Sequence, residues 1–351
     1  MDILIGSYYT GGTGADKVKT MLANEWSAQN HNVTILSMDD THGYYPLDER
    51  IIKIVLPHFR GVEVYKDILV MRNFLKKNKY DRIITFADNF SVKMMMASVG
   101  LGINNKIIIS ERNDPKAEEQ DILNRYFRNW AFRRARRIVF QTTGAQEYYK
   151  KEIREKSCVI PNPINDNLPD RWEGERDKRI VAVGRLEPQK NMKMLIEAFA
   201  KLHQEYPDYI LEIYGEGSLK ESIECDIAAR GIEKRAFLRG FDNDVWSKML
   251  KAKMYVSSAN YEGISNSMLE ALGMGIPTIV TDCPAGGERM FIEHMVNGLL
   301  VRVGDAEGLY RSMKLLIEDE KITDSFSRRS PSIKNEINSK SIMRMWSSAL
   351  E

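Results

Sequence analysis

Two glutamates and two cations have types and spacing that could bind hydroxyl groups and a diphosphate. Solvated surface charge is the alternative interpretation for each pair taken alone. Glu262 and Glu270 have seven residues between them, and Arg185 and Lys190 follow Gly184 at a spacing of five. The interval between the glutamates begins with Gly263, Ile264, Ser265, Asn266 and Ser267. An arginine fork and a lysine point charge can bind one diphosphate, and carboxylates accept hydrogen bonds from hydroxyl groups.

Both pairs are predicted to lie where a strand is followed by a helix. The apolar run Ile180–Val183 precedes the two cations, and Met254–Ser257 precedes Glu262. A helix is predicted to begin near Ser267, which puts Glu270 about one turn inside it. Backbone N–H groups and aligned peptide dipoles at that end of a helix stabilise an anion. Because a buried carboxylate without a partner is costly, Glu270 is expected to bind a hydroxyl-rich group such as ribose.

A glycine-rich stretch near the N-terminus is a further candidate for phosphate binding. Gly12 and Gly14 follow the first predicted strand and open a helix, and glycines there let backbone N–H groups approach a phosphate. Lys17 stands where a dinucleotide fingerprint would have its third glycine. This favours a phosphate of another ligand over a nicotinamide cofactor, and a plain strand-to-helix turn remains the alternative.

The elements that must position these residues alternate along the whole chain. Short apolar runs separated by amphipathic stretches are typical of βαβ units and parallel sheets. Pro161 and Pro163 interrupt the pattern, which restarts at Arg179. We expect an α/β protein with two Rossmann-like, doubly wound domains, residues 1–165 and 166–330, facing each other across a cleft that holds the site. The amphipathic segment within 331–351 is expected to pack back toward the first domain.

Composition narrows the protein class. The chain has 351 residues, of which 43% are hydrophobic and 28% charged, as in soluble globular proteins. Its apolar runs are shorter than the ~18 residues of a membrane span, and we expect a cytoplasmic protein.

Cys158, Cys225 and Cys283 share no metal-ligand spacing. Asp242 and Asp244 resemble a metal-binding DxD motif, but they stand just before a predicted helix, so capping is expected instead. No metal and no cofactor are therefore predicted.

Charge is distributed unevenly. The first 165 residues have 25 Lys and Arg against 19 Asp and Glu, and the remainder has 26 against 30. No acidic residue lies between Asp121 and Glu147, whereas six arginines and several aromatic residues do. The segment Arg125–Arg137 is therefore predicted to contact an anionic membrane surface. A solvated helix face is an equally good interpretation, and nucleic acid is not expected.

Several motifs together resemble family 4 of the retaining glycosyltransferases. Besides the two pairs above they are Gly184-Arg185-Leu186, Tyr214-Gly215-Glu216-Gly217, Gly275-Ile276-Pro277 and Thr281-Asp282-Cys283-Pro284. The resemblance covers residues 179–303 and, more loosely, the first half. It implies a GT-B fold, in which the second domain binds a nucleotide-sugar donor and the first an acceptor.

The resemblance also implies roles for individual residues. Arg185 and Lys190 match the pair that binds the donor diphosphate and stabilises the leaving nucleotide, and Glu262 matches a glutamate near the donor sugar. Glu270 matches the ribose-binding glutamate. The donor-binding set is completed by Gly12, Gly14, Gly184, Arg239 and the backbone of residues 263–267. Many members have a histidine where this chain has Glu111 and Arg112, which are candidates for the acceptor side.

The implied activity is transfer of a hexosyl unit, with retention and without a metal, from a nucleotide sugar, expected to be a UDP-sugar. The implied acceptor is a glycan or a polyprenyl-diphosphate-linked saccharide in capsule or exopolysaccharide synthesis, which would place the enzyme at the inner face of the membrane. Two other classes remain open: a GT-B phosphorylase or epimerase-like enzyme, and a non-catalytic protein that binds nucleotide sugars.

Overall fold

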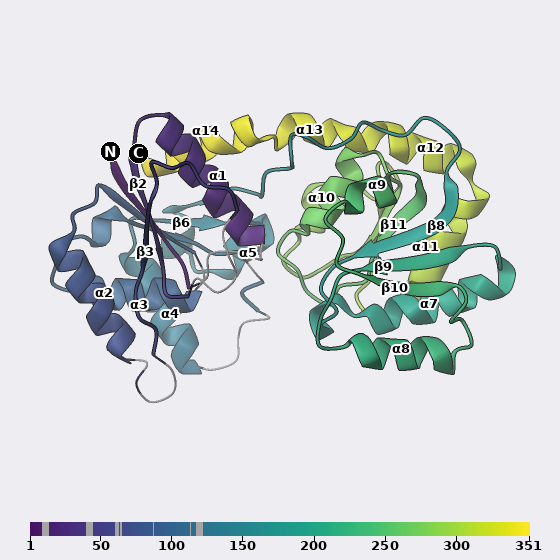
Figure 1. Cartoon of the computed structure of the whole chain (residues 1–351), viewed down its shortest axis with the longest axis horizontal. Coiled ribbons are helices and arrows are strands. Elements are labelled where there is room, and N and C mark those ends of the chain that lie inside the picture. The colour runs from purple at the N-terminus through teal and green to yellow at the C-terminus, as the bar shows by residue number, and fades with distance from the viewer. Residues whose placement is uncertain are drawn as a thin grey trace. The chain divides into compact units, whose positions relative to one another are not determined.

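The computed structural model describes residues 1–8, 14–39, 45–59, 63, 65–86, 88–112, 114–116 and 122–351. The chain divides into two compact units (Figure 1). Unit 1 consists of Met1–Pro163 and Ser339–Glu351, and unit 2 of Ile164–Asn338. Both are built on parallel sheets, so the predicted α/β class with two doubly wound domains is confirmed.

Within the described residues, unit 1 contains a seven-stranded sheet in the order β3-β2-β1-β4-β5-β6-β7. Its strands are β1 (Asp2–Gly6), β2 (Asn32–Ser37), β3 (Ile52–Val55), β4 (Arg82–Phe86), β5 (Ile107–Ser110), β6 (Arg137–Phe140) and β7 (Ser157–Val159). Central strands such as β5 are fully buried, as expected for a parallel sheet covered on both faces. The edge strand β3 exposes Ile52 and Val55.

Helices surround this sheet. They are α1 (Gly14–Ala28), α2 (Tyr65–Lys77), α3 (Asp88–Ser98), α4 (Ile122–Arg134), α5 (Thr143–Tyr148), α6 (Lys151–Arg154) and α14 (Ser339–Leu350). The last helix buries Trp346, whose ring centroid lies 6.1 Å from that of Phe86 at the end of β4. The C-terminal helix thus completes the core of the unit that contains the N-terminus.

Unit 2 contains a six-stranded parallel sheet in the order β10-β9-β8-β11-β12-β13. Its strands are β8 (Asp177–Val183), β9 (Ile210–Tyr214), β10 (Ala236–Gly240), β11 (Ala252–Ser257), β12 (Thr278–Thr281) and β13 (Leu299–Val301). Its helices are α7 (Met192–Glu205), α8 (Lys220–Ala229), α9 (Val245–Leu250), α10 (Asn266–Gly273), α11 (Ala306–Glu318), α12 (Glu320–Arg329) and α13 (Ile333–Glu336). Helices α7, α8 and α11 pack on one face of the sheet, and α9 and α10 lie on the other (Figure 1).

The strand order of unit 2 sets the place of the site. From β8 the chain continues to β9 on one side, and from β11 it continues to β12 on the other, although β8 and β11 are neighbours. Ligands of open α/β sheets bind at such a switch point, beside the carboxyl ends of the strands. The connections that follow β8 and β11 carry the predicted cations and glutamates.

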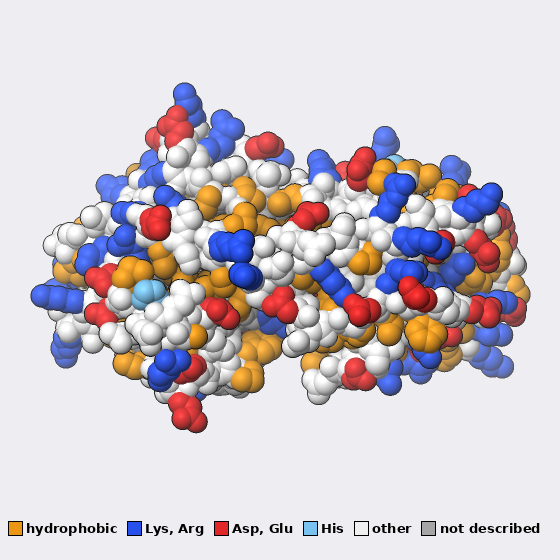
Figure 2. All heavy atoms as spheres, turned by 90° about the horizontal axis from the view of Figure 1, so that it is seen from above, with side chains coloured by type: hydrophobic (Ala, Val, Ile, Leu, Met, Phe, Trp, Pro, Cys, Tyr) orange, Lys and Arg blue, Asp and Glu red, His pale blue; other side chains and the backbone are white. Residues whose placement is uncertain are grey.

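None of the helices in the described ranges is long and apolar enough to cross a bilayer. On the face shown in Figure 2, acidic and basic side chains are interspersed.

Candidate active site

Two loops form a hydrogen-bonded unit at the switch point of unit 2. The first follows β8 and the second follows β11. The Asn260 backbone N–H donates to the Gln189 carbonyl at 2.8 Å, and the Asn260 side chain donates to the Pro188 carbonyl at 3.0 Å. The Ser258 hydroxyl donates to the Lys190 carbonyl at 3.0 Å. Each loop therefore fixes the position of the other.

Lys190 and Glu262 form an ion pair across these two loops. Their side chains are only 12% and 14% exposed. Burial works to lower the pKa of Lys190, but the charge and hydrogen bond of Glu262 outweigh it and raise that pKa above its ordinary value. Lys190 therefore stays cationic at physiological pH. The resemblance in the sequence implied that both residues lie near a nucleotide-sugar donor, but it did not predict that they form an ion pair.

Arg185 lies on the first loop with its side chain at the surface. Its Nη2 donates to Oε1 of Gln189 at 3.0 Å, and the Gln189 amide donates to the Tyr261 carbonyl at 3.1 Å. The positive charge of Arg185 acts on Lys190 and opposes the rise in its pKa. The structure thus places both predicted cations on one short loop, one exposed and one buried.

Helix α10 begins beside these residues. The Ser265 hydroxyl caps it by accepting from the Met268 backbone N–H at 3.4 Å. The Ser267 hydroxyl bonds to the Tyr255 hydroxyl at 2.8 Å and donates to the Val183 carbonyl at 3.1 Å, which ties the helix to β8 and β11. Glu270 lies in the helix and is 9% exposed. Residues 263–270 therefore lie together at the carboxyl end of β11, as the sequence predicted.

A third loop, after β12, supports the second one. A Cβ added at Gly287 would lie 1.8 Å from the Gly263 carbonyl oxygen, so only glycine allows this approach. The next residue, Glu288, is 2% exposed, and in the described structure its Oε2 accepts no hydrogen bond. Burial raises the pKa of Glu288 to about 8, and the charge of Glu262 adds to this. Sequence reasoning missed Glu288, although Gly286-Gly287 after a buried strand was an available signal.

Arg239 belongs to a network of ion pairs. Its guanidinium lies 2.6 Å from Glu212, which also pairs with Arg179 at 3.0 Å, and it stacks on Phe237 at 4.5 Å. Burial opposes ionisation of Glu212, but the two guanidinium groups lower its pKa. The Arg239 side chain is thus held by protein groups.

The candidates for the acceptor side lie in unit 1. Glu111 is buried and accepts from the Tyr149 hydroxyl at 2.5 Å. Arg112 lies over the Trp346 ring at 5.3 Å and donates to Ser110 Oγ at 2.7 Å. Burial lowers the pKa of Arg112.

The glycine-rich stretch is described only from its end. Gly14 is the first residue of α1, whereas Gly12 lies outside the described residues. The first turns of α1 contain a buried pair that the sequence did not suggest. Lys19 lies 2.8 Å from Asp16 and donates to the Ser7 hydroxyl at 2.5 Å.

The two aspartates of the DxD sequence make local contacts. Asp242 accepts from the Asp244 backbone N–H at 2.8 Å, and Asp244 accepts from the Ser247 hydroxyl at 2.5 Å. Asp244 occupies the N-cap position of α9 but caps no backbone N–H. One aspartate therefore stands at the N-cap position as predicted, but its carboxylate accepts from the Ser247 hydroxyl and not from a backbone N–H. In the ranges that the structure describes, no three potential ligands gather into a metal site.

Comparison with known proteins decides the family. The model for Glycosyltransferase Family 4 matches residues 12–168, and the model for Glycosyl transferases group 1 matches residues 166–332. The chain belongs to family 4 of the GT-B glycosyltransferases. The resemblance found in the sequence is thereby confirmed.

Two relatives of this family 4 glycosyltransferase come from Campylobacter jejuni. One is N-acetylgalactosamine-N,N'-diacetylbacillosaminyl-diphospho-undecaprenol 4-alpha-N-acetylgalactosaminyltransferase, 28% identical over 240 residues, and the match covers 65% of either chain. The chain thus spans just under two thirds of that relative's length. The other is GalNAc-alpha-(1->4)-GalNAc-alpha-(1->3)-diNAcBac-PP-undecaprenol alpha-1,4-N-acetyl-D-galactosaminyltransferase, 26% identical over 316 residues, covering 88% of this chain and 86% of the relative.

A solved structure supports the fold of the family 4 glycosyltransferase over its whole length. Anabaena Alr3699/HepE in complex with UDP and glucose superposes with a TM-score of 0.84 at 20% identity, covering 100% of this chain and 99% of that chain. The predicted GT-B fold is therefore confirmed.

Proposed function

We propose that the chain is a retaining, metal-independent hexosyltransferase that uses a UDP-sugar and acts on a glycan or a polyprenyl-diphosphate-linked saccharide. The observation that carries the proposal is the Lys190–Glu262 pair beside Arg185 and the N-terminus of α10. The UDP complex of HepE supports UDP as the nucleotide. The undecaprenol-linked acceptors in the names of the two relatives support the acceptor class.

In this proposal the donor diphosphate binds between two cations and a helix N-terminus. Arg185 contributes an accessible fork, and Lys190 contributes a positive charge that it shares with Glu262. We propose that these two cations bind the phosphates without a divalent metal. Backbone N–H groups of residues 263–267 contact the sugar and phosphates. Glu270 accepts hydrogen bonds from the ribose, and the strand end Arg239-Gly240 contacts the base through main-chain groups. Gly184 lies against the Lys190 side chain, and Gly12 and Gly14 are further proposed donor-binding residues.

The proposed chemistry is a front-face substitution. The bond between the anomeric carbon and the diphosphate oxygen breaks while the acceptor oxygen bonds to the same face of that carbon. The acceptor proton passes to the departing phosphate oxygen, so the atoms and charges balance without a protein base. Lys190 and Arg185 stabilise the negative charge that develops on the leaving UDP. Glu262 is positioned near the sugar by its ion pair, and the protein otherwise acts by orientation.

Glu111 and Arg112 of unit 1 are proposed to contact the acceptor. A carboxylate that is buried and bonded to Tyr149 is poorly placed to take up a proton, and a guanidinium cannot act as a base near neutral pH. A lipid-linked acceptor would bring the enzyme to the inner face of the cell membrane, for capsule or exopolysaccharide synthesis. The arginines of Arg125–Arg137 are proposed to contact that surface.

The first test is a thermal-shift panel of nucleotides and nucleotide sugars with and without EDTA. A ligand at ~100 times its dissociation constant stabilises the protein by about 2.7 kcal/mol. We expect stabilisation by UDP and one UDP-sugar, indifferent to EDTA. Product formed from that donor should retain its anomeric configuration by NMR. An inverted product would overturn retention, and loss of turnover in EDTA would overturn metal independence.

A matched pair of variants tests the site. Lys190→Ala should lower turnover at least about 100-fold, the usual loss for a group that stabilises transition-state charge. Lys193→Ala removes an exposed lysine three positions along the same segment and should leave turnover unchanged. Equal turnover of both variants would contradict the role given to Lys190. Orthophosphate-dependent sugar release would instead identify a phosphorylase.

A further inference from the structure

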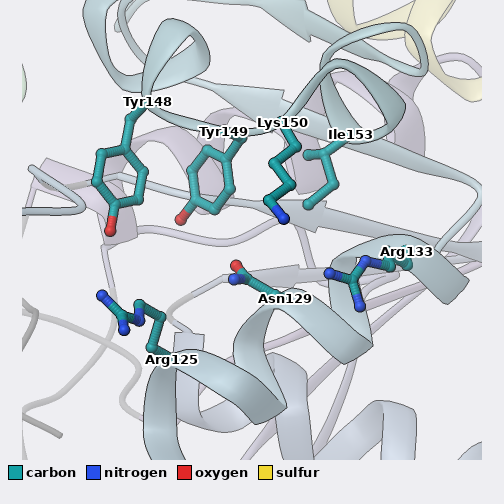
Figure 3. Close-up of a pocket in the computed structure, with 7 residues that line it drawn as sticks. All are labelled: Arg125, Asn129, Arg133, Tyr148, Tyr149, Lys150 and Ile153. Carbon is teal, nitrogen blue, oxygen red and sulfur yellow. The ribbon is translucent and has the colours of Figure 1, made fainter. Parts of the chain in front are cut away.

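Unit 1 contains a cavity of about 460 Å³ between α4 and the junction of α5 and α6 (Figure 3). Arg125, Asn129 and Arg133 reach it from successive turns of α4. From the opposite wall, Tyr148, Tyr149 and Lys150 point toward these three side chains (Figure 3). All of these residues lie in one compact unit, so the cavity does not depend on how the two units are placed.

The cavity is lined by positive charge. Arg125, Arg133 and Lys150 stand at its rim with exposed side chains. In the part of the chain that the structure describes, Lys150 has no ion-pair partner, whereas Arg133 shares its charge with Glu152 at 2.6 Å. Behind the wall, the buried Arg128 stacks on the Tyr148 and Tyr149 rings at 5.6 and 5.2 Å. The three rim cations, Arg125, Arg133 and Lys150, favour an anionic occupant.

Asn129 supplies a polar group without a partner. Its Oδ1 is buried, and in the described structure no donor lies within hydrogen-bond distance of it. A buried polar atom without a hydrogen-bond partner is destabilising. Because the amide can be turned over without changing its shape, Asn129 can equally present its NH₂ group to a ligand. The cavity therefore combines cations with an amide oxygen that has no partner among the described residues.

Helix α4 also exposes a group of large apolar side chains, here called the apolar stripe: Ile122, Leu123, Tyr126 and Phe127. Their exposed fractions are 75%, 63%, 60% and 39%. At 3.6 residues per turn the stripe lies next to the row Arg125, Asn129 and Arg133 on the helix surface. Exposed apolar groups that gather beside arginines are typical of helices that lie in a membrane interface.

We propose that this cavity binds the phosphate of an anionic phospholipid head group while the apolar stripe lies among the lipids at the membrane surface. Arg125 and Arg133 would bind the phosphate oxygens as guanidinium forks, with Lys150 and the Asn129 amide as further donors. The apolar stripe favours a lipid over a free phosphate as the source of that group. This inference rests on the membrane location in the proposed function. It replaces a general contact of Arg125–Arg137 with the membrane by binding of one phosphate in this cavity.

The test is co-sedimentation of the full chain with phosphatidylcholine vesicles that contain or lack phosphatidylglycerol. The variant Arg125→Gln/Lys150→Gln removes two charges from the cavity. The matched control is Arg134→Gln/Lys151→Gln, which removes one charge from α4 and one from α6. Arg134 stacks on Trp130, and the Lys151 side chain is 82% exposed. We expect the cavity variant to bind anionic vesicles at least about tenfold more weakly than the control, because only the cavity variant loses charge-assisted hydrogen bonds to the phosphate.

Each outcome decides the matter. Equal weakening of the two variants would show diffuse attraction and overturn the site. A thermal shift with inorganic pyrophosphate, with wild-type vesicle binding by the cavity variant, would assign the cavity to a soluble phosphate and also overturn it. Replacing Ile122 and Leu123 by serine should weaken binding that persists at high salt, and unchanged binding would exclude the stripe. A thermal shift with UDP tests the proposed function separately, because the side chains that are proposed to bind UDP lie in unit 2.

Discussion

Lys190 and Glu262 lie 72 residues apart in the chain and form a largely buried ion pair at the carboxyl ends of two adjacent strands. Neighbouring strands β8 and β11 bring them together, and hydrogen bonds between their loops hold them there. The pair keeps a lysine charged where the donor diphosphate is proposed to bind.

Removing one partner should cost more stability than removing both. Lys190→Met leaves Glu262 buried without its cation, and losing one member of a buried pair typically costs about 3 kcal/mol. The double variant Lys190→Met/Glu262→Gln should recover part of this in urea unfolding. Turnover should be low in the single variant and should stay low in the double variant. A double variant that is less stable than Lys190→Met would contradict this account.

Glu288 should make stability fall as the pH rises. Its pKa is raised from 4.5 to about 8, so between these values the unfolded chain has lost the proton that the folded chain retains. The stabilisation is complete below pH 4.5 and disappears as the pH rises through about 8. Glu288→Gln, which resembles the protonated acid, should lose less thermal stability than wild type between the two pH values. Parallel melting curves across that range would refute the assignment.

Gly287→Ala should disturb the loop that contains Glu262. The new Cβ would lie 1.8 Å from the Gly263 oxygen, so the loop must move, and a displacement of about 1 Å at an active site can cost about 100-fold in rate. We expect a loss of turnover of that order. Gly231→Ala is the control, because its Cβ meets open space and only its positive φ is strained. Similar turnover of the two variants would show that the contact has no functional effect.

Trp346 should be required for unit 1. Its ring is fully buried in α14, and Trp→Ala in a core costs about 3–5 kcal/mol. Met345→Ala changes the neighbouring side chain, which is 43% exposed, and should shift stability by no more than about 0.5 kcal/mol. Chemical unfolding followed by fluorescence and circular dichroism measures both. A small effect of Trp346→Ala would contradict a role of α14 in the core.

Much of the fold could be predicted because most strands are buried on both faces. Runs such as Ile107-Ile108-Ile109 carry a clear signal. The edge strand Ile52–Val55 was not predicted, since Lys53 interrupts its apolar residues and three of its four residues are exposed.

The composition of the site could be predicted more readily than its contacts. The spacing of Glu262 and Glu270 is local, and local spacing can be read from a sequence. The Lys190–Glu262 pair depends on which strands are neighbours, and Glu288 lies in a single 3-10 turn without periodicity. The contact between Asp244 and Ser247 depends on side-chain geometry that capping preferences do not specify.

Unit 1 is made of one chain segment that precedes unit 2 in the sequence and one that follows it. This order has a consequence for synthesis on the ribosome. All the strands of its sheet emerge early, but the helix that brings Trp346 emerges only after unit 2 has been made. The apolar surface beside Phe86 therefore stays uncovered while about 175 further residues are translated. At 5–20 residues per second this takes roughly ten to thirty-five seconds. A nascent chain stalled before Ser339 is the form in which this surface is available to chaperones.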